Sequence, residues 1–132
     1  MCSSDLLTGY IGAIGFFPGV LLISGTGSIA IGRNADGTMI RSGGWGPHFG
    51  DEGSGFWIGR EAIRTALRAQ DSLELFDFVD AVRQALNIPA ITDIPGEWAS
   101  GRIGVPGVAK VAETVICLYP QEPARQIGRA HV

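Results

Sequence analysis

The first third of the chain contains one short stretch with a helical period, followed by three short stretches that resemble strands. Four apolar side chains recur at helical spacing near the N-terminus, namely Leu7, Tyr10, Ile11 and Ile14. They predict the end of a helix over residues 7–14, which Gly15 stops. Three short stretches separated by turn residues then predict strands, at residues 20–24, 29–33 and 38–42. The first run is continuous between glycines, which predicts a strand buried on both faces, and short turns between the strands indicate an antiparallel corner of a sheet.

In the second half of the chain, apolar side chains recur at helical spacing over longer stretches. A helix is predicted from a cap at Asp51 or Ser54 to about residue 69, with one apolar face made of Ile58, Ala62, Ile63, Ala66 and Leu67. Ser72 is predicted to cap a second helix, whose apolar stripe contains Leu75, Phe76, Val79, Val82 and Leu86. A short helix at residues 96–100 and a last one marked by Val108, Val111, Ala112, Val115 and Leu118 follow. Strands followed by helices indicate an α+β fold, or part of a larger α/β unit.

Composition narrows the class of protein. With 132 residues, 45% of them hydrophobic, the chain can form one domain with a real core. A net charge of −3 without a basic run argues against a nucleic-acid partner. The apolar runs are strand-sized and the start does not resemble a signal peptide, so no membrane partner is expected. Two cysteines are too few for a disulfide framework. We therefore expect a cytoplasmic protein.

Both ends of the chain differ in character from the rest. Residues 1–6 (MCSSDL) match one translated frame of a common DNA-sequencing adapter, if a GTG start codon is read as Met. Residues 127–132 (IGRAHV) match another frame, from the complementary strand. We expect both segments to be non-native and the natural segment to be about residues 7–126. Cys2 and His131 would then carry no functional meaning.

A glycine turn, Gly25-Thr26-Gly27-Ser28, follows the first predicted strand. Backbone N–H groups and two hydroxyls at a strand end suit a phosphate group. The turn is not a P-loop, because no Gly-Lys-Ser/Thr follows it. It is not a dinucleotide fingerprint either, because a strand follows instead of a helix. Taken alone, it is equally compatible with an ordinary tight turn.

A second glycine-rich segment covers residues 43–55 and contains six glycines, Trp45 and the pair Asp51-Glu52. An aromatic ring, a carboxylate and bare backbone are a suitable set for holding a sugar. The simpler alternative is that Asp51 only caps the following helix. Ser54 does not lie in a Gly-x-Ser-x-Gly elbow, because Glu52 occupies the first position. His48 has no cysteine nearby, so the segment does not predict a zinc site.

Residues 19–28 and 43–60 together closely resemble N-acetylglucosamine kinases of the BadF/BadG/BcrA/BcrD ATPase family, within the actin-like superfamily of sugar kinases and chaperone ATPases. The strong resemblance covers about residues 19–69. It implies an α/β fold, a partial actin-like (ribonuclease H-like) sugar kinase domain with a short β-sheet followed by helices. On this basis residues 7–126 are the central part of such a domain.

The resemblance also implies an activity and its residues. The activity is phosphorylation of N-acetylglucosamine or a related amino sugar, with ATP and Mg²⁺ as cofactors. The turn that would bind phosphate consists of Gly25, Thr26, Gly27 and Ser28, and the residues that would bind the sugar are Gly44, Trp45, Gly46 and Asp51. Asp5 occupies the place of the family's catalytic base, although it lies in the segment expected to be non-native. No residue is assigned as a metal ligand.

Several parts of the family pattern are absent from the sequence. These are an upstream Asp-Gly-Gly-Gly-Thr-like phosphate turn and the later glycine pair that holds adenosine. We expect the parent protein to be the kinase and this chain to be an inactive piece of it. The alternatives are an ATPase that activates a 2-hydroxyacyl-CoA dehydratase type enzyme, or a non-catalytic sugar-binding or sensing domain. A missing lobe would leave an apolar patch exposed, so a homo-oligomer or self-association is expected.

Overall fold

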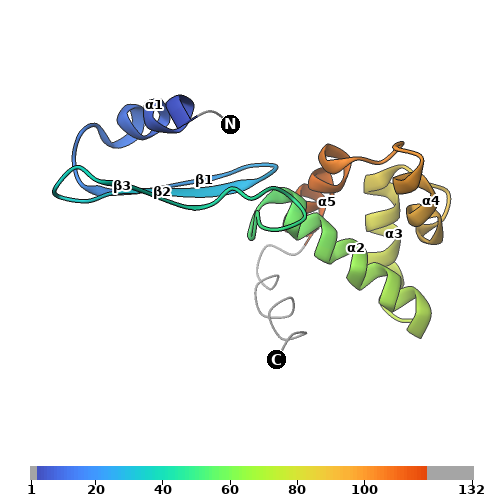
Figure 1. The fold of residues 1–132 in the computed structure, drawn as a ribbon. Coiled ribbons are helices and arrows are strands. Elements are labelled where there is room, and N and C mark those ends of the chain that lie inside the picture. Colours follow the sequence, from blue (N-terminus) through green and yellow to red (C-terminus); the bar gives the residue numbers. More distant parts are fainter. Residues whose placement is uncertain (1–2, 119–132) are drawn as a thin grey trace.

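The computed structural model describes residues 3–118. Its elements are α1 (Ser3–Ile14), β1 (Gly19–Ser24), β2 (Ser28–Arg33), β3 (Met39–Gly43), α2 (Gly55–Ser72), α3 (Phe76–Leu86), the 3-10 helix η1 (Ile91–Asp93), α4 (Ile94–Ala99) and α5 (Val105–Leu118). The strands lie with α1 in one part of the molecule, and the four later α-helices form a second part beside it (Figure 1). The expectations for Cys2, His131 and residues 127–132 concern positions outside the described residues.

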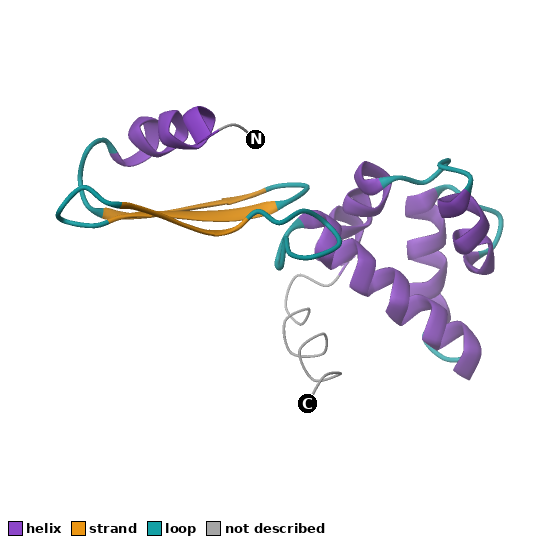
Figure 2. Ribbon diagram, viewed as in Figure 1, coloured by secondary structure: helices purple, strands orange, loops and turns teal. Residues whose placement is uncertain are grey.

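The strands form an antiparallel meander in the order β1-β2-β3 (Figure 2). Ser24 pairs with Ser28 across the first turn, and Arg33 pairs with Met39 across the second. Helix α1 packs on one face of this sheet, where its Leu6 and Tyr10 meet Ile29 and Ile31 of β2. The predicted three-stranded corner is confirmed, with strand bounds that differ from the prediction by one residue.

β1 departs from the prediction of a strand buried on both faces. Val20 and Leu22 are 72% and 69% exposed, whereas Leu21 and Ile23 pack against the cluster beneath α1. Successive side chains of a strand point to opposite faces, and within the described residues only one face of the sheet is covered. The prediction was therefore wrong for the face that carries Val20 and Leu22.

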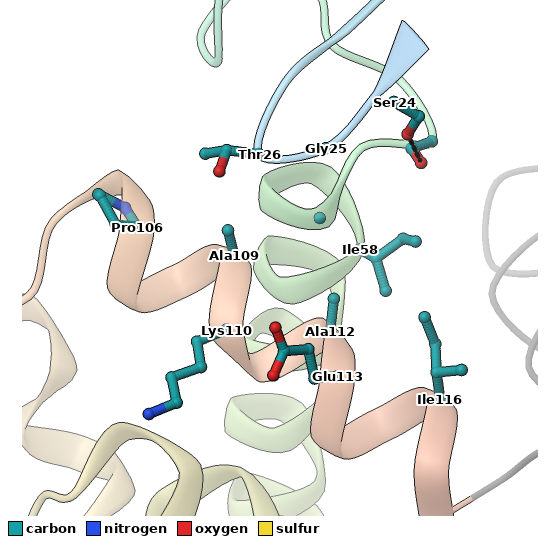
Figure 3. Close-up of a pocket in the computed structure, with 12 residues that line it drawn as sticks. Ser24, Gly25, Thr26, Ile58, Pro106, Ala109, Lys110, Ala112, Glu113 and Ile116 are labelled. Atoms are coloured by element: carbon teal, nitrogen blue, oxygen red, sulfur yellow. Dashed lines mark hydrogen bonds between the residues drawn. The ribbon is translucent and has the colours of Figure 1, made fainter. Parts of the chain in front are cut away.

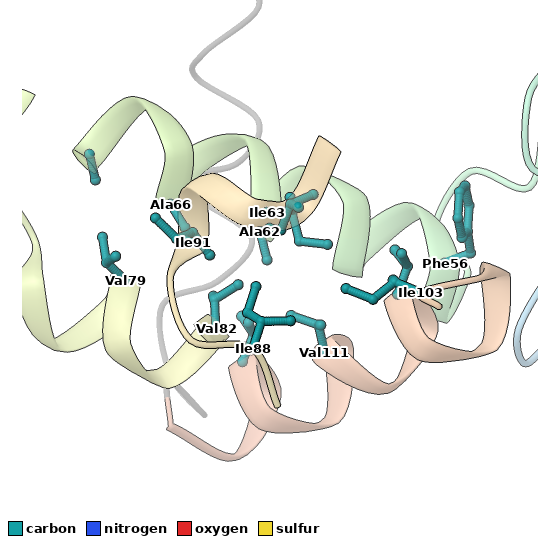
Figure 4. Close-up of a cluster of buried hydrophobic side chains, with 14 residues drawn as sticks. Phe56, Ala62, Ile63, Ala66, Val79, Val82, Ile88, Ile91, Ile103 and Val111 are labelled. Atoms are coloured by element: carbon teal, nitrogen blue, oxygen red, sulfur yellow. The ribbon is translucent and has the colours of Figure 1, made fainter. Parts of the chain in front are cut away.

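The second part of the molecule is built around one apolar core, which the helices and η1 enclose (Figure 4). Its members include Ala62, Ile63 and Ala66 of α2, all on the predicted apolar face. Val111 of α5 packs into the same core. None of the described helices has the length and apolar character needed to cross a membrane.

The link between α2 and α3 was predicted incorrectly. Ser72 is the last residue of α2, where its hydroxyl donates to the Arg68 carbonyl at 3.1 Å, and it does not cap α3. The chain then reverses through Leu73 and Leu75, both with left-handed backbone at φ 57° and 50°. Leu75 precedes α3, and Phe76 is its first residue. Both side chains are exposed, and the buried stripe of α3 begins at Val79.

Candidate functional site

The turn of residues 25–28 connects β1 to β2 and contacts the beginning of α2. The carbonyl oxygen of Gly25 accepts the Gly55 N–H at 2.7 Å, and that of Thr26 accepts the Phe56 N–H at 3.1 Å. These N–H groups have no partner within the helix, because they belong to its first turn. The contacts therefore fix the 25–28 turn beside the positive end of the α2 dipole.

Asp51 is directed at the same turn. It is buried, with 7% of its surface exposed, and its Oδ1 accepts the Ser28 N–H at 3.2 Å. The cap of α2 is Ser54, whose hydroxyl accepts the Trp57 N–H at 3.2 Å. Of the two predicted caps, Ser54 is the correct one. The carboxylate of Asp51 instead joins the 43–55 segment to the 25–28 turn.

Two further hydrogen bonds strengthen this junction. The Ser28 hydroxyl donates to the Glu52 carbonyl at 2.8 Å, and the Ser24 hydroxyl donates to the Gly53 carbonyl at 3.3 Å. The two glycine-rich segments, which the sequence separates by a strand pair, are thus held together as one unit. Such a network limits how far the backbone groups of the turn can move.

A cavity of about 430 Å³ lies between the two segments. Its wall contains every predicted binding residue except Trp45, namely Gly25, Thr26, Gly27, Ser28, Gly44, Gly46 and Asp51. Leu6, Ile23 and Ile29 add an apolar side, and Arg41 adds a positive charge. The cavity therefore combines backbone groups, hydroxyls, a carboxylate and a guanidinium group, which suits a polar ligand.

Trp45 is the predicted sugar-binding residue that lies outside this cavity wall. Its side chain is 68% exposed, and the guanidinium carbon of Arg41 lies 5.1 Å from its ring centroid. A contact between Trp45 and a sugar stays a prediction. Arg41 was missed in the sequence, where its only signal is a lone cation at a strand end shortly before the glycine-rich segment.

A second cavity, of about 640 Å³, opens on the helical side of the same turn (Figure 3). Gly25 and Thr26 line both cavities. The remaining wall comes from Ser24, from the start of α2 and from α5, including Pro106, Ala109 and Lys110. The 25–28 turn therefore borders two cavities, one on each side. Sequence reasoning named no residue of α5 here, because the contact depends on packing between distant segments.

Asp5 lies in the first turn of α1 and is exposed. It does not line the 430 Å³ cavity, although its neighbour Leu6 does. Its role as a base stays a prediction. Within residues 3–118, no group of three or more His, Cys, Asp or Glu side chains is placed to hold a metal ion.

Comparison with known proteins matches the chain to one ATPase family and to two amino-sugar kinases. Residues 1–103 match the BadF/BadG/BcrA/BcrD ATPase family. An N-acetylmuramic acid/N-acetylglucosamine kinase of Clostridium acetobutylicum is 58% identical over 53 residues, which are 40% of this chain. An N-acetyl-D-glucosamine kinase of Dictyostelium discoideum is 51% identical over 55 residues, or 42% of this chain. Each match covers 17% of the relative's length.

A solved structure from Chromobacterium violaceum, provisionally named an N-acetylglucosamine kinase, has a similar fold. It aligns with a TM-score of 0.70 and 30% sequence identity, over 93% of this chain and 44% of its own. The alignment confirms the expected partial actin-like sugar kinase fold. The chain spans less than half of that structure's length.

Proposed function

Because the chain belongs to the BadF/BadG/BcrA/BcrD ATPase family, we propose that it is the central part of a kinase that uses ATP to phosphorylate N-acetylglucosamine or a related amino sugar. One observation carries the proposal most directly. The 25–28 turn lies between two cavities, and Asp51 joins it to the 43–55 segment. A phosphoryl transfer needs the acceptor hydroxyl within about 3–3.5 Å of the phosphoryl group, and two cavities that share Gly25 and Thr26 can bring their ligands together at this turn.

The acceptor sugar is assigned to the 430 Å³ cavity. That volume falls within the usual range for a small-molecule site. Asp51 has one carboxylate oxygen bonded to the Ser28 N–H, and a carboxylate can accept further hydrogen bonds from sugar hydroxyls. Gly46 has left-handed backbone, and a Cβ there would meet no atom within 4 Å, so a ligand can come close to its peptide group. At Gly44 the equivalent space is filled by Ile29.

The nucleotide is assigned to the 640 Å³ cavity, with its phosphates at the turn. A Cβ placed on Gly25 would meet no atom within 4 Å, so there is open space above its backbone. The Thr26 hydroxyl and the Lys110 ammonium group line this cavity and can bind an anion. The N–H groups of Gly55 and Phe56 at the start of α2 are already bonded to the turn. Mg²⁺ bound to the nucleotide would neutralise phosphate charge when present. The protein's own contribution is to position the phosphates and exclude water.

A carboxylate near the start of α1 is proposed as the base that accepts the proton of the attacking hydroxyl. Asp5 lies there, one position before a residue of the cavity wall. The chain covers only part of its relatives, so we propose that it binds ligands but does not complete transfer by itself. Detection of ATP-dependent sugar phosphorylation by the isolated chain would contradict that part of the proposal.

Isothermal titration with N-acetylglucosamine tests the site, using Asp51→Asn and Glu52→Gln as a matched pair. Both variants remove one negative charge, but only Asp51 lines the cavity. Glu52 contributes its backbone carbonyl, which the variant keeps. We expect Asp51→Asn to weaken sugar binding about tenfold or more, because a charge-assisted hydrogen bond is lost. Glu52→Gln should bind as the wild type does.

The same titration, repeated with a non-hydrolysable ATP analogue, separates the alternatives. Binding of both ligands supports the kinase. Sugar binding without nucleotide binding would favour a sensing domain or a kinase piece that lacks the rest of its nucleotide site, and nucleotide binding without sugar binding would favour an ATPase activator. Equal losses in Asp51→Asn and Glu52→Gln would contradict the assignment of Asp51 to the sugar.

A further inference from the structure

A further cavity, of about 330 Å³, lies between the 43–55 segment, the start of α2 and α4. It shares no lining residue with either of the cavities at the 25–28 turn. Its volume is within the usual range for a small-molecule site. The proposed function uses none of its residues, so the ligand of this cavity is an independent question.

The wall of this cavity is largely apolar and partly aromatic. Phe56 and Ile103, at one end of the helical core, line it (Figure 4). The ring of Trp98 on α4 packs against that of Phe56, with 6.4 Å between the ring centroids. Trp98 is still 40% exposed, so part of its ring is open to a ligand. Such a wall suits the apolar ring or chain of a small molecule.

The charged groups of the wall are all positive. The guanidinium groups of Arg60 and Arg64 line the cavity, and both pair with one atom, Glu61 Oε1, at 3.4 and 3.1 Å. One carboxylate cannot balance two guanidinium groups, so this triad keeps one positive charge in excess. Among the described residues, no carboxylate lines the cavity itself. Each guanidinium group has further N–H groups that can bind an anion.

We propose that this cavity binds a small organic anion, one with an apolar ring or chain and a carboxylate group. The apolar part would lie against Phe56 and Trp98. The carboxylate would accept hydrogen bonds from Arg60 and Arg64. The simpler alternative is a gap at the edge of the core that takes apolar groups whatever their charge. The excess positive charge argues against that alternative, because only an anion complements it.

An NMR titration with phenylpropionate tests the proposal, because the chain has three tryptophans and each gives one indole N–H signal. Trp98 lines the cavity, whereas Trp45 and Trp57 do not. The Trp98→Phe variant identifies the Trp98 signal. We expect phenylpropionate to shift this signal to saturation and to leave the Trp57 signal in place.

Two related compounds separate the parts of the ligand. Phenylpropionamide has the same ring and chain without the charge, so it should bind about tenfold more weakly, because a charge-assisted hydrogen bond is lost. Acetate has the carboxylate without the ring. It should leave the Trp98 signal unchanged at the same concentrations, because the apolar wall then has nothing to contact.

Arg64→Gln and Arg68→Gln are a matched pair of variants, since both arginines are exposed on α2 and only Arg64 lines the cavity. In Arg64→Gln, Glu61 neutralises Arg60, so phenylpropionate should bind no more tightly than its amide. Arg68→Gln should keep the tenfold ratio. Arg64→Lys should keep part of it, because the charge remains without the planar geometry.

The other outcomes contradict the proposal. Equal affinity for phenylpropionate and its amide in the wild type would leave an apolar gap without charge preference. A shift of the Trp57 signal without the Trp98 signal would place the ligand elsewhere. A tenfold ratio that survives in Arg64→Gln also overturns the proposal, and if that variant fails to fold by circular dichroism, an undiminished ratio in Arg64→Lys does so. Sugar and nucleotide are absent from these titrations, so failure here leaves the proposed function intact.

Discussion

Asp51 shows how single residues fix the site. Its backbone is left-handed, at φ 63°, and its carboxylate is buried against the 25–28 turn. Burying a carboxylate is unfavourable unless hydrogen bonds compensate, which the Ser28 N–H does in part. A Cβ at the adjacent position 27 would lie 2.7 Å from Asp51 Oδ2, so any residue other than glycine there would require the carboxylate to shift. The two residues therefore depend on each other.

Gly27→Ala should displace the Asp51 carboxylate. We expect a loss of about 1–3 kcal/mol of stability, as for other overpacked positions, together with weaker binding of N-acetylglucosamine. Gly12→Ala on α1 is the control, since an added Cβ there meets nothing within 4 Å and Gly12 lines neither cavity. Thermal unfolding and titration measure both effects. An unchanged melting temperature and affinity in Gly27→Ala would contradict the dependence of Asp51 on Gly27.

At the scale of elements, the wall of the second cavity depends on close packing of α2 against α5. Gly59 of α2 lies against the backbone of α5, where a Cβ would fall 1.9 Å from the Val108 carbonyl oxygen. A backbone atom cannot move aside as a flexible side chain can. The contact at Gly59 thus sets how near α5 comes to the 25–28 turn.

Gly59→Ala should push the two helices apart. The lost packing should cost about 1–3 kcal/mol, more than the gain in helix propensity of about 1 kcal/mol that alanine brings. Gly96→Ala in α4 adds a Cβ with nothing within 4 Å, so it should keep or slightly raise stability. Urea unfolding distinguishes them. If both variants shift the urea midpoint equally, the close approach of α5 to Gly59 does not limit which residue fits at that position.

The end of α4 carries a charge pair that makes stability depend on pH. Arg102 donates to Glu97 at 2.6 and 2.7 Å, and this pairing holds the pKa of Glu97 below its usual value of 4.5. A carboxyl whose pKa is lowered by folding stabilises the protein above its unfolded pKa, and that contribution is lost as pH falls through the folded pKa. Glu97→Gln should therefore reduce the melting temperature at neutral pH, and its difference from the wild type should shrink as pH falls below 4.5 and through the lowered pKa of Glu97. A difference that stays constant with pH would contradict this role.

At the scale of the whole molecule, local patterns predicted more than long-range packing did. The strand pattern and the Ser54 cap follow from neighbouring residues, and both were found in the sequence. Trp45 was predicted to bind the sugar; its ring lies outside the cavity wall against Arg41, and its contact with a sugar stays a prediction. Leu75 was placed in a buried stripe, since nothing about a leucine indicates a left-handed turn. The α5 wall could not be found, because it depends on how α2 and α5 pack.

One face of the three-stranded sheet is left uncovered by the described residues. Val20, Leu22 and Ile40 are exposed there, and the register places all three on one face. Within residues 3–118, β1 pairs only with β2, so its other edge is open as well. An open edge beside an apolar face favours association between chains.

We therefore expect the chain to self-associate as its concentration rises, which sedimentation velocity measures. The double variant Val20→Lys/Leu22→Lys should shift the distribution toward the monomer, because two charges would be buried by any contact through this face. Leu73→Lys is the control, since Leu73 is equally exposed but lies at the far end of α2. It should sediment as the wild type does. Association of the double variant to the wild-type extent would show that chains meet through another surface, and loss of association in Leu73→Lys would place that surface at the helices.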